Sequence, residues 1–176
     1  RVDDHELQAD HILIATGGRP TIPDIPGAEL GITSDGFFEL GHQPQSTLVV
    51  GAGYIATELA GVLNSLGTEV TMLLRKKTLL KEFDATLGDT LMSEMEAAGI
   101  KILTGVRLQE IRTAPDGTLS IFHDADQTTT GFDSVLWAIG REPLTADLNL
   151  DHAGVQVDTE GFIPTDKYQC TNIDGV

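Results

Sequence analysis

The segment Gly51-Ala52-Gly53-Tyr54-Ile55-Ala56 restricts the possible folds of this chain more than any other. It lies between residues 47–50, an apolar and β-branched run typical of a buried parallel strand, and residues 54–66, which read as a helix. In such a unit the first glycine permits a tight turn, and the second lets a pyrophosphate approach the backbone. A small residue at Ala56 lets helix and strand pack closely. The start of the helix offers unpaired amides and a positive dipole end to phosphates. The segment therefore predicts a dinucleotide-binding unit; a turn with only a structural role is the alternative.

The neighbouring segments alternate between helix-like and strand-like patterns. Elements are expected at residues 35–40 (a helical turn), 69–74 and 100–103 (strands), 84–98 (a helix), and 108–113, 119–123 and 128–133 (antiparallel strands). Strand, helix, strand, helix and strand, followed by a meander, predict an α/β fold. Its expected form is a Rossmann-like doubly wound parallel sheet with an antiparallel three-stranded meander on one face.

The helix expected at residues 84–98 has a recognisable start and an apolar face. Asp84 is a suitable N-cap, because its carboxylate can accept a hydrogen bond from a first-turn amide. The apolar positions that share one helical face are Leu87, Leu91, Met95 and Ala98. We expect this face to pack on the sheet.

Two segments resemble each other at an offset of 123 residues. Residues 12–17 and residues 135–140 are each apolar, end in a glycine and are followed closely by arginine and proline. We expect them to be entry and exit strands that bracket one domain. The tail beyond Leu148 contains strand-like runs at 155–157 and 162–164, which we expect to belong mainly to another domain.

Positive charge is concentrated directly after the second expected strand. Arg75, Lys76, Lys77 and Lys81 are four of the 11 basic residues in a chain of net charge −16. A protein that binds NAD places an acid here to bond the ribose 2′-hydroxyl, whereas a guanidinium can hold a 2′-phosphate through two hydrogen bonds. The cluster predicts NADPH as the preferred nucleotide. An ordinary solvated basic loop is the alternative.

Composition excludes several other classes of function. A net charge of −16 argues against nucleic acid as a partner. No apolar run approaches the roughly 20 residues of a membrane-spanning helix, so no membrane partner is expected. The single cysteine, Cys170, excludes an internal disulfide and fits a reducing cytoplasm. The five histidines show no paired spacing, so no metal site is expected.

Six stretches, taken in order, resemble the pyridine nucleotide-disulfide oxidoreductase family, and within it the glutathione reductase branch most closely. They are residues 12–20, 34–38, 51–58, 75–84, 137–143 and 166–169. In that family an NADPH-binding domain is inserted into an FAD-binding domain. The resemblance therefore implies three parts: residues 1–19 as a remnant of an FAD-domain strand and crossover, 20–147 as the NADPH-binding domain, and 148–176 as a remnant of the return into the FAD domain.

The resemblance implies roles for four positions around the nicotinamide. Tyr54 matches the tyrosine that covers the nicotinamide pocket, and Ile55 matches a wall of that pocket. Glu58 lies one helical turn beyond Tyr54 and matches the glutamate that bonds the carboxamide. Gly140 matches a glycine whose backbone lies against the cofactor.

At the other end of the nucleotide, the resemblance matches Arg75 and Lys81 to the two positions that hold the 2′-phosphate. A lysine at position 81 keeps the charge of the arginine common there but loses its bidentate geometry. Lys76 is taken as a further contact, although it departs from the residues often found at its position. Whether Lys76 and Lys77 contact the 2′-phosphate itself stays open.

The family's redox cysteine pair, FAD fingerprint and His–Glu pair have no counterpart in this chain. The resemblance therefore implies a domain that binds NADPH for the rest of a parent flavoenzyme, which transfers electrons through FAD to glutathione disulfide. The chain itself is expected to hold no catalytic residue and to be inactive alone. The parent is expected to be a homodimer.

Two alternatives remain at the level of the sequence. One is the same domain of a trypanothione- or mercuric-reductase-like enzyme, and the other is a stand-alone nucleotide-binding module. The lipoamide branch is disfavoured, because it favours an acid at the position of Arg75.

Overall fold

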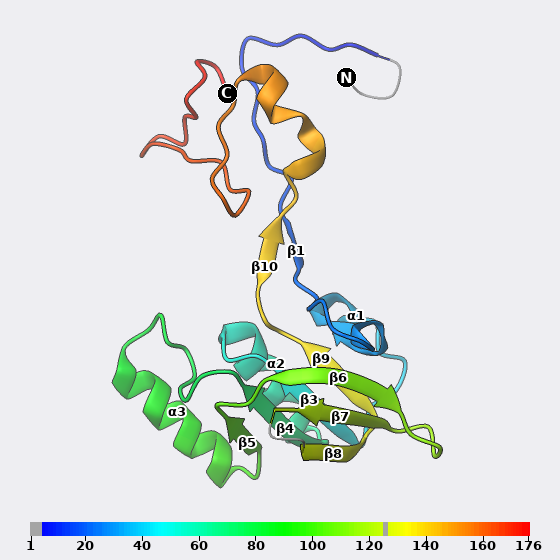
Figure 1. Cartoon of the computed structure of the whole chain (residues 1–176). Coiled ribbons are helices and arrows are strands. Elements are labelled where there is room, and N and C mark those ends of the chain that lie inside the picture. Colours follow the sequence, from blue (N-terminus) through cyan, green and yellow to red (C-terminus); the bar gives the residue numbers. More distant parts are fainter. Residues whose placement is uncertain (1–4, 125–126) are drawn as a thin grey trace. The chain divides into compact units, whose positions relative to one another are not determined.

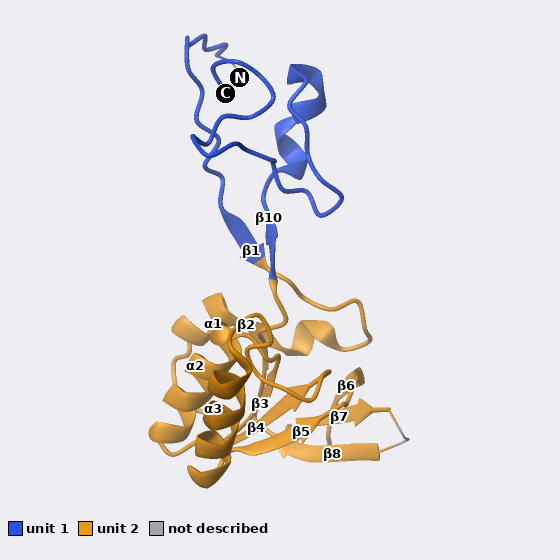
Figure 2. Ribbon diagram, turned by 90° about the vertical axis from the view of Figure 1, so that its left-hand side faces the viewer, with its two compact units in different colours: residues 1–19, 141–176 blue, residues 20–140 orange. Residues whose placement is uncertain are grey.

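The computed structural model describes residues 5–124 and 127–176, and the chain divides into two compact units. The larger unit comprises Pro20–Gly140. The smaller unit combines Arg1–Arg19 with Arg141–Val176 (Figure 2). The two units are described separately below.

The larger unit is built on a parallel five-stranded sheet with the strand order β2-β9-β3-β4-β5 (Figure 1). In chain order its strands are β2 (Ile32–Thr33), β3 (Ser46–Val50), β4 (Glu69–Leu74), β5 (Lys101–Thr104) and β9 (Ser134–Trp137). Before β3 the chain forms a short 3-10 helix η1 (Ala28–Leu30) and the single-turn helix α1 (Ser34–Phe38).

The connections between these strands cover both faces of the sheet. Helices α2 (Tyr54–Ser65) and α3 (Ala85–Ala97) carry the chain from β3 through β4 to β5. The antiparallel strands β6 (Leu108–Thr113), β7 (Leu119–His123) and β8 (Gln127–Phe132) then lead back past β3 to β9. Parallel crossovers are right-handed, so reversing direction along the sheet moves the connection to the opposite face. Figure 2 shows the helices on one side of the sheet and the meander on the other, and the predicted fold class is confirmed.

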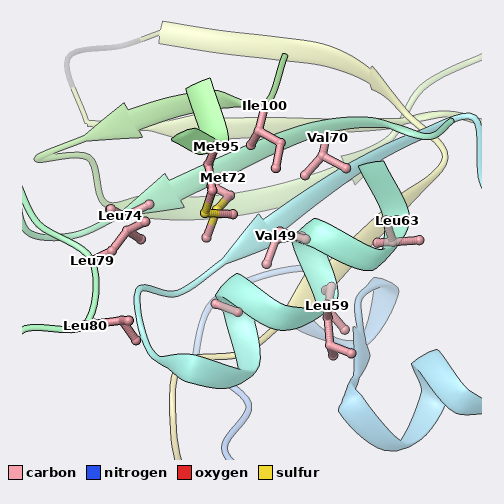
Figure 3. Packing of buried hydrophobic residues seen from close by; sticks show 13 residues of the cluster. Val49, Leu59, Leu63, Val70, Met72, Leu74, Leu79, Leu80, Met95 and Ile100 are labelled. Atoms are coloured by element: carbon pink, nitrogen blue, oxygen red, sulfur yellow. The ribbon is translucent and has the colours of Figure 1, made fainter. Parts of the chain in front are cut away.

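Two apolar cores follow from the alternation of side chains along the central strands. Val49 and Met72 point to the helices (Figure 3) and form the helix-side core with Leu136 and with residues of α2 and α3. Their sequence neighbours point the other way and form the meander-side core, which includes Leu48 and Trp137. Strands buried on both faces read as continuous apolar runs, which is why the sequence pattern identified them.

Helix α3 begins where the sequence predicted and packs the middle of the predicted face, Leu91 and Met95, on the helix-side core. The Asp84 carboxylate accepts a hydrogen bond from the Thr86 amide at 2.8 Å, which confirms the predicted N-cap. The predicted face is wrong at Leu87, which is 49% exposed, and at Ala98, which is also exposed. The buried residues of the helix are Gly88 and Met95. A Cβ at Gly88 would lie 2.7 Å from the Leu79 carbonyl oxygen, so this glycine lets α3 approach the preceding loop.

No helix among the described residues is long and apolar enough to span a membrane.

The smaller unit contains a two-stranded sheet of β1 (Gly18–Pro20), except for its last residue Pro20, and β10 (Arg141–Pro143). A 2.5 Å ion pair joins Arg19 to Glu142 across it, and the Arg141 guanidinium donates to the Gly18 carbonyl. The 3-10 helices η2 (Ala146–Leu148) and η3 (Leu150–Ala153) follow.

Three strands predicted in this smaller unit do not form. Residues 12–17 precede β1 without being a strand, and residues 155–157 and 162–164 are irregular. A strand needs a neighbouring strand to satisfy its backbone groups. Among the described residues the segment at 12–17 pairs with no strand, although the Ile12 amide donates to the Gly175 carbonyl at 2.8 Å. The first three residues of the other segment, residues 135–140, do form a strand, as part of β9 in the larger unit.

The packing of α3 against the preceding loop predicts opposite effects for two helical glycines. Gly88→Ala should destabilise the fold by about 1–3 kcal/mol, because the added methyl group overlaps the Leu79 carbonyl. Gly61→Ala in α2 is the matched control, since an added Cβ there meets no atom within 4 Å. It should stabilise the fold by up to about 1 kcal/mol through helix propensity. Urea unfolding of both variants measures the difference, and equal effects would contradict the proposed close packing.

Candidate nucleotide-binding site

The site begins at the carboxyl ends of the neighbouring strands β3 and β9. The connection that leaves β3 runs through α2 on the helix side of the sheet, whereas the connection that enters β9 is the meander on the other side. Sheets of α/β proteins bind ligands beyond the carboxyl ends of the strands where the connections change face. Backbone hydrogen bonds continue past both strand ends. The Gly51 amide donates to the Leu73 carbonyl at 3.1 Å, and the Ala138 amide donates to the Val50 carbonyl at 2.9 Å. The turn after β3 is therefore held firmly between its two neighbours.

The two glycines of this turn meet different constraints. Gly51 has φ +144°, and a Cβ on it would lie 2.1 Å from the Ala138 carbonyl oxygen, so no side chain fits. Gly53 has an ordinary φ of −86°, and a Cβ on it would meet no atom within 4 Å. The first glycine is required by the fold itself. The second faces open space, which is where a group bound to the turn would lie.

Helix α2 starts at this turn without a side-chain cap. Its N-cap is Gly53, which makes no side-chain hydrogen bond, whereas Asp84 caps α3. The first-turn amides of a helix lack partners within the helix and carry partial positive charge. Ala56, fully buried, packs the helix against the sheet. The arrangement leaves the amide end of α2 open to an anion.

A basic loop follows β4 and is tied to the glycine turn by a hydrogen bond. The Leu80 amide donates to the Ala52 carbonyl at 2.8 Å. Leu80 adopts φ +49°, a conformation that costs a non-glycine residue about 1–3 kcal/mol, while its side chain is buried in the helix-side core. This bond and this burial hold residues 75–83 beside residues 51–53, so the two predicted parts of the site are brought together.

The charges of the basic loop act on one another. Arg75, Lys76 and Lys77 are exposed, and the Lys81 ammonium lies 2.8 Å from the Glu82 carboxylate. Hydrogen bonding and attraction to Glu82 raise the pKa of Lys81, while the positive charge of Arg75 acts in the opposite direction. Hydrogen bonding and attraction to Lys81 lower the pKa of Glu82, and the charge of Lys76 adds to this. Arg75 and Lys76 are therefore close enough to the Lys81–Glu82 pair for their charges to affect its pKa values.

The remaining predicted residues lie on α2 and after β9. Tyr54 and Glu58 are one helical turn apart and both exposed, Tyr54 to 56%. Ile55 is partly buried against the helix-side core. Gly140 has φ +146°, and its carbonyl accepts a hydrogen bond from the Thr21 amide at 2.9 Å. The roles of Tyr54, Ile55, Glu58 and Gly140 around a nicotinamide stay predictions.

Three residues of the site were missed by sequence reasoning. Leu80 and Ala138 act through their backbone groups, and no side-chain pattern identifies such a role. Glu82 could have been found, because it directly follows Lys81 in sequence. The sequence interpretation considered only the positive charges of this loop.

The sheet topology and the glycine turn define an α/β protein of the Rossmann-like class. The whole chain, residues 1–176, matches the family described as pyridine nucleotide-disulphide oxidoreductase. The chain therefore belongs to the pyridine nucleotide-disulphide oxidoreductase family.

Two glutathione reductases are among the relatives of the chain. The protein from Schizosaccharomyces pombe is 46% identical over 169 residues, which cover 95% of this chain and 36% of that protein. The protein from Yarrowia lipolytica is 42% identical over 170 residues, which cover 96% of this chain and 36% of that protein. The chain thus spans about a third of the length of these relatives.

The fold is also found in a solved flavoprotein. The Cu(II) complex of the HOCl-induced flavoprotein disulfide reductase RclA from Escherichia coli superposes with a TM-score of 0.89 at 27% identity, covering 99% of this chain and 40% of that chain. Another structure of RclA gives a TM-score of 0.83 at 26% identity over 92% of this chain and 37% of that chain. The likeness covers the parallel sheet, its helices and the meander.

The two glycines of the turn should respond differently to a methyl group. Gly51→Ala should lower the free energy of unfolding by at least about 2 kcal/mol, because of the overlap with Ala138 and the left-handed φ. Gly53→Ala should change it by no more than about 0.5 kcal/mol, since the position is open. Chemical denaturation of the free chain measures both values. If both variants lost the same free energy of unfolding, the proposed overlap between a side chain at position 51 and the Ala138 carbonyl would be contradicted.

Proposed function

We propose that residues 20–147 form the NADPH-binding domain of a flavin-dependent glutathione-disulfide reductase and supply its hydride donor. The observation that carries this proposal is the joining of two anion-binding features by one hydrogen bond. The open amide end of α2 and the basic loop after β4 meet where the Leu80 amide bonds the Ala52 carbonyl. A nucleotide that carries both a pyrophosphate and a 2′-phosphate matches this pair of features.

Each part of the nucleotide has a counterpart in the site. The turn from Gly51 to Gly53 and the first amides of α2 would hold the pyrophosphate, because the open space at Gly53 admits it. Arg75 and Lys81 would hold the 2′-phosphate, with Lys76 beside them. A guanidinium can donate two parallel hydrogen bonds to a phosphate, so Arg75 is the stronger of these contacts. The acid that a 2′-hydroxyl requires is absent directly after β4, where Arg75 stands.

The nicotinamide end would lie against the outer face of α2. When bound, NADPH supplies a hydride, and the chemistry belongs to the cofactors rather than to the protein. Tyr54 would cover the nicotinamide pocket, Ile55 would form a wall and Glu58 would orient the carboxamide. Gly140, which has no side chain, would let the backbone after β9 approach the nucleotide. The role of these residues is to bind and orient the donor.

The relatives support the substrate and the domain organisation that we propose. The two relatives described above, at 42% and 46% identity, are glutathione reductases, so we assign glutathione disulfide as the substrate of the parent enzyme. Residues 1–19 and 148–176 would belong to an FAD-binding domain of the parent, which we propose to be a cytoplasmic homodimer. The redox disulfide needs two cysteines, and this chain has one, Cys170.

Nucleotide preference tests the proposed function directly. NADPH should bind this chain more tightly than NADH in calorimetric titrations, because the 2′-phosphate adds charge-assisted contacts. Arg75→Gln should weaken NADPH binding by about 1.5–3 kcal/mol and leave NADH unchanged. Arg112→Gln is the control, since Arg112 is also an exposed arginine but lies on β6 of the meander. Equal affinities for the two nucleotides in the unaltered chain would refute the assignment to NADPH.

The single cysteine leads to a second expectation. The purified chain should consume no NADPH in the presence of glutathione disulfide, because it lacks a dithiol that could pass electrons to the substrate. Absorbance at the reduced-nicotinamide band measures this, with a complete glutathione reductase as positive control. Sustained oxidation of NADPH by the chain alone would contradict the proposed division of labour.

A further inference from the structure

The basic loop contains one carboxylate whose position is fixed by the same contacts that fix the cations. The Phe83 amide donates to the Leu80 carbonyl at 2.8 Å and closes a turn. The two central residues of this turn are Lys81 and Glu82. Because Leu80 is also bonded to Ala52, the turn is held beside the glycine turn. The backbone of Glu82 is therefore held in place within the candidate site.

The Lys81 ammonium and the Glu82 carboxylate form a 2.8 Å ion pair on this turn. Their side chains are 55% and 77% exposed, so water screens the pair and its strength is modest. A 2′-phosphate carries roughly −1.5 to −2 charges at pH 7 and competes with the carboxylate for the same ammonium. The pair can be opened by such an anion, but the opening has a cost that a neutral side chain at position 82 would not impose.

We propose that Glu82 is a specificity-determining residue that weakens recognition of the 2′-phosphate by holding Lys81. This inference rests on the proposed function, because it assumes that Lys81 faces the 2′-phosphate. Glu82 acts on that phosphate in two ways: it occupies the ammonium and it repels a second anion. Neither effect reaches a nucleotide that ends in a 2′-hydroxyl, so Glu82 lowers the preference for NADPH over NADH. Arg75, which forms no ion pair within the described part of the chain, keeps that preference in favour of NADPH.

The surrounding charges agree with this assignment. Hydrogen bonding and attraction to Lys81 keep the pKa of Glu82 below its ordinary value, so the carboxylate is ionised at neutral pH. The pKa of Lys81 is raised in turn by Glu82, so the ammonium stays protonated. Both partners are therefore charged under the conditions in which a nucleotide binds.

Two small probes isolate the 2′-phosphate from the rest of the nucleotide. Adenosine 2′,5′-bisphosphate and adenosine 5′-monophosphate differ by that group alone. In calorimetric titrations of the full chain at low ionic strength, Glu82→Gln should tighten binding of the bisphosphate by about two- to fivefold. The affinity for the monophosphate should stay unchanged. Glu110→Gln is the matched control, because Glu110 forms an equally local ion pair with Arg112 on β6 and its loss changes the net charge by the same amount.

A double-mutant cycle with Lys81→Gln tests whether Glu82 acts through Lys81. In the Lys81→Gln background the gain from Glu82→Gln should shrink to less than half of its size in the unaltered chain. In 0.5 M salt the gain should also shrink, because salt screens exposed charges. Urea unfolding of each variant verifies that the fold is intact.

Three results would overturn the proposal: no gain from Glu82→Gln, an equal gain for both probes, or an undiminished gain in the Lys81→Gln background. Failure of the proposed function has a different signature. In that case the unaltered chain would bind neither probe, or would bind both equally. A chain that prefers the bisphosphate but ignores Glu82→Gln would keep the proposed function and refute this inference alone.

Discussion

The close approach of Gly51 to the Ala138 carbonyl is the constraint on which the rest of the site depends. It occurs where β3 and β9 end side by side in the parallel sheet. A Cβ at Gly51 would lie 2.1 Å from that oxygen, so the chain can turn there only as glycine. This turn also determines where α2 begins. Because no side chain caps α2, the amides of its first turn stay open to a ligand. One backbone contact thus connects the sheet topology to the chemistry of the site.

A second backbone contact joins the two halves of the candidate site. The bond from the Leu80 amide to the Ala52 carbonyl holds a charged loop against the glycine turn, and it persists although Leu80 adopts a left-handed conformation. The buried side chain of Leu80 contributes the apolar contacts that offset this strain. The loop concentrates positive charge on an otherwise acidic chain of net charge −16. Glu82 then moderates that charge from within the loop itself.

Sequence reasoning succeeded where burial imposes a clear pattern. Strands such as β4, buried on both faces, read as continuous apolar runs, and the Asp84 cap follows from a local hydrogen bond. It failed where a distant segment decides the outcome. Gly88, which lies outside the predicted face of α3, closely approaches the Leu79 carbonyl, and residues 12–17 pair with no strand in the described chain. Neither fact is contained in the local pattern.

The sequence by itself determined the class of fold, the glycine turn and the cluster of cations, because each depends on residue types and spacing along the chain. Only the tertiary structure decided that the cations stand beside the turn and that Lys81 is held by Glu82. Leu80 makes the physical reason plain. Its role lies in a backbone amide directed at the Ala52 carbonyl, and the direction of a backbone group is set by packing rather than by the identity of the side chain.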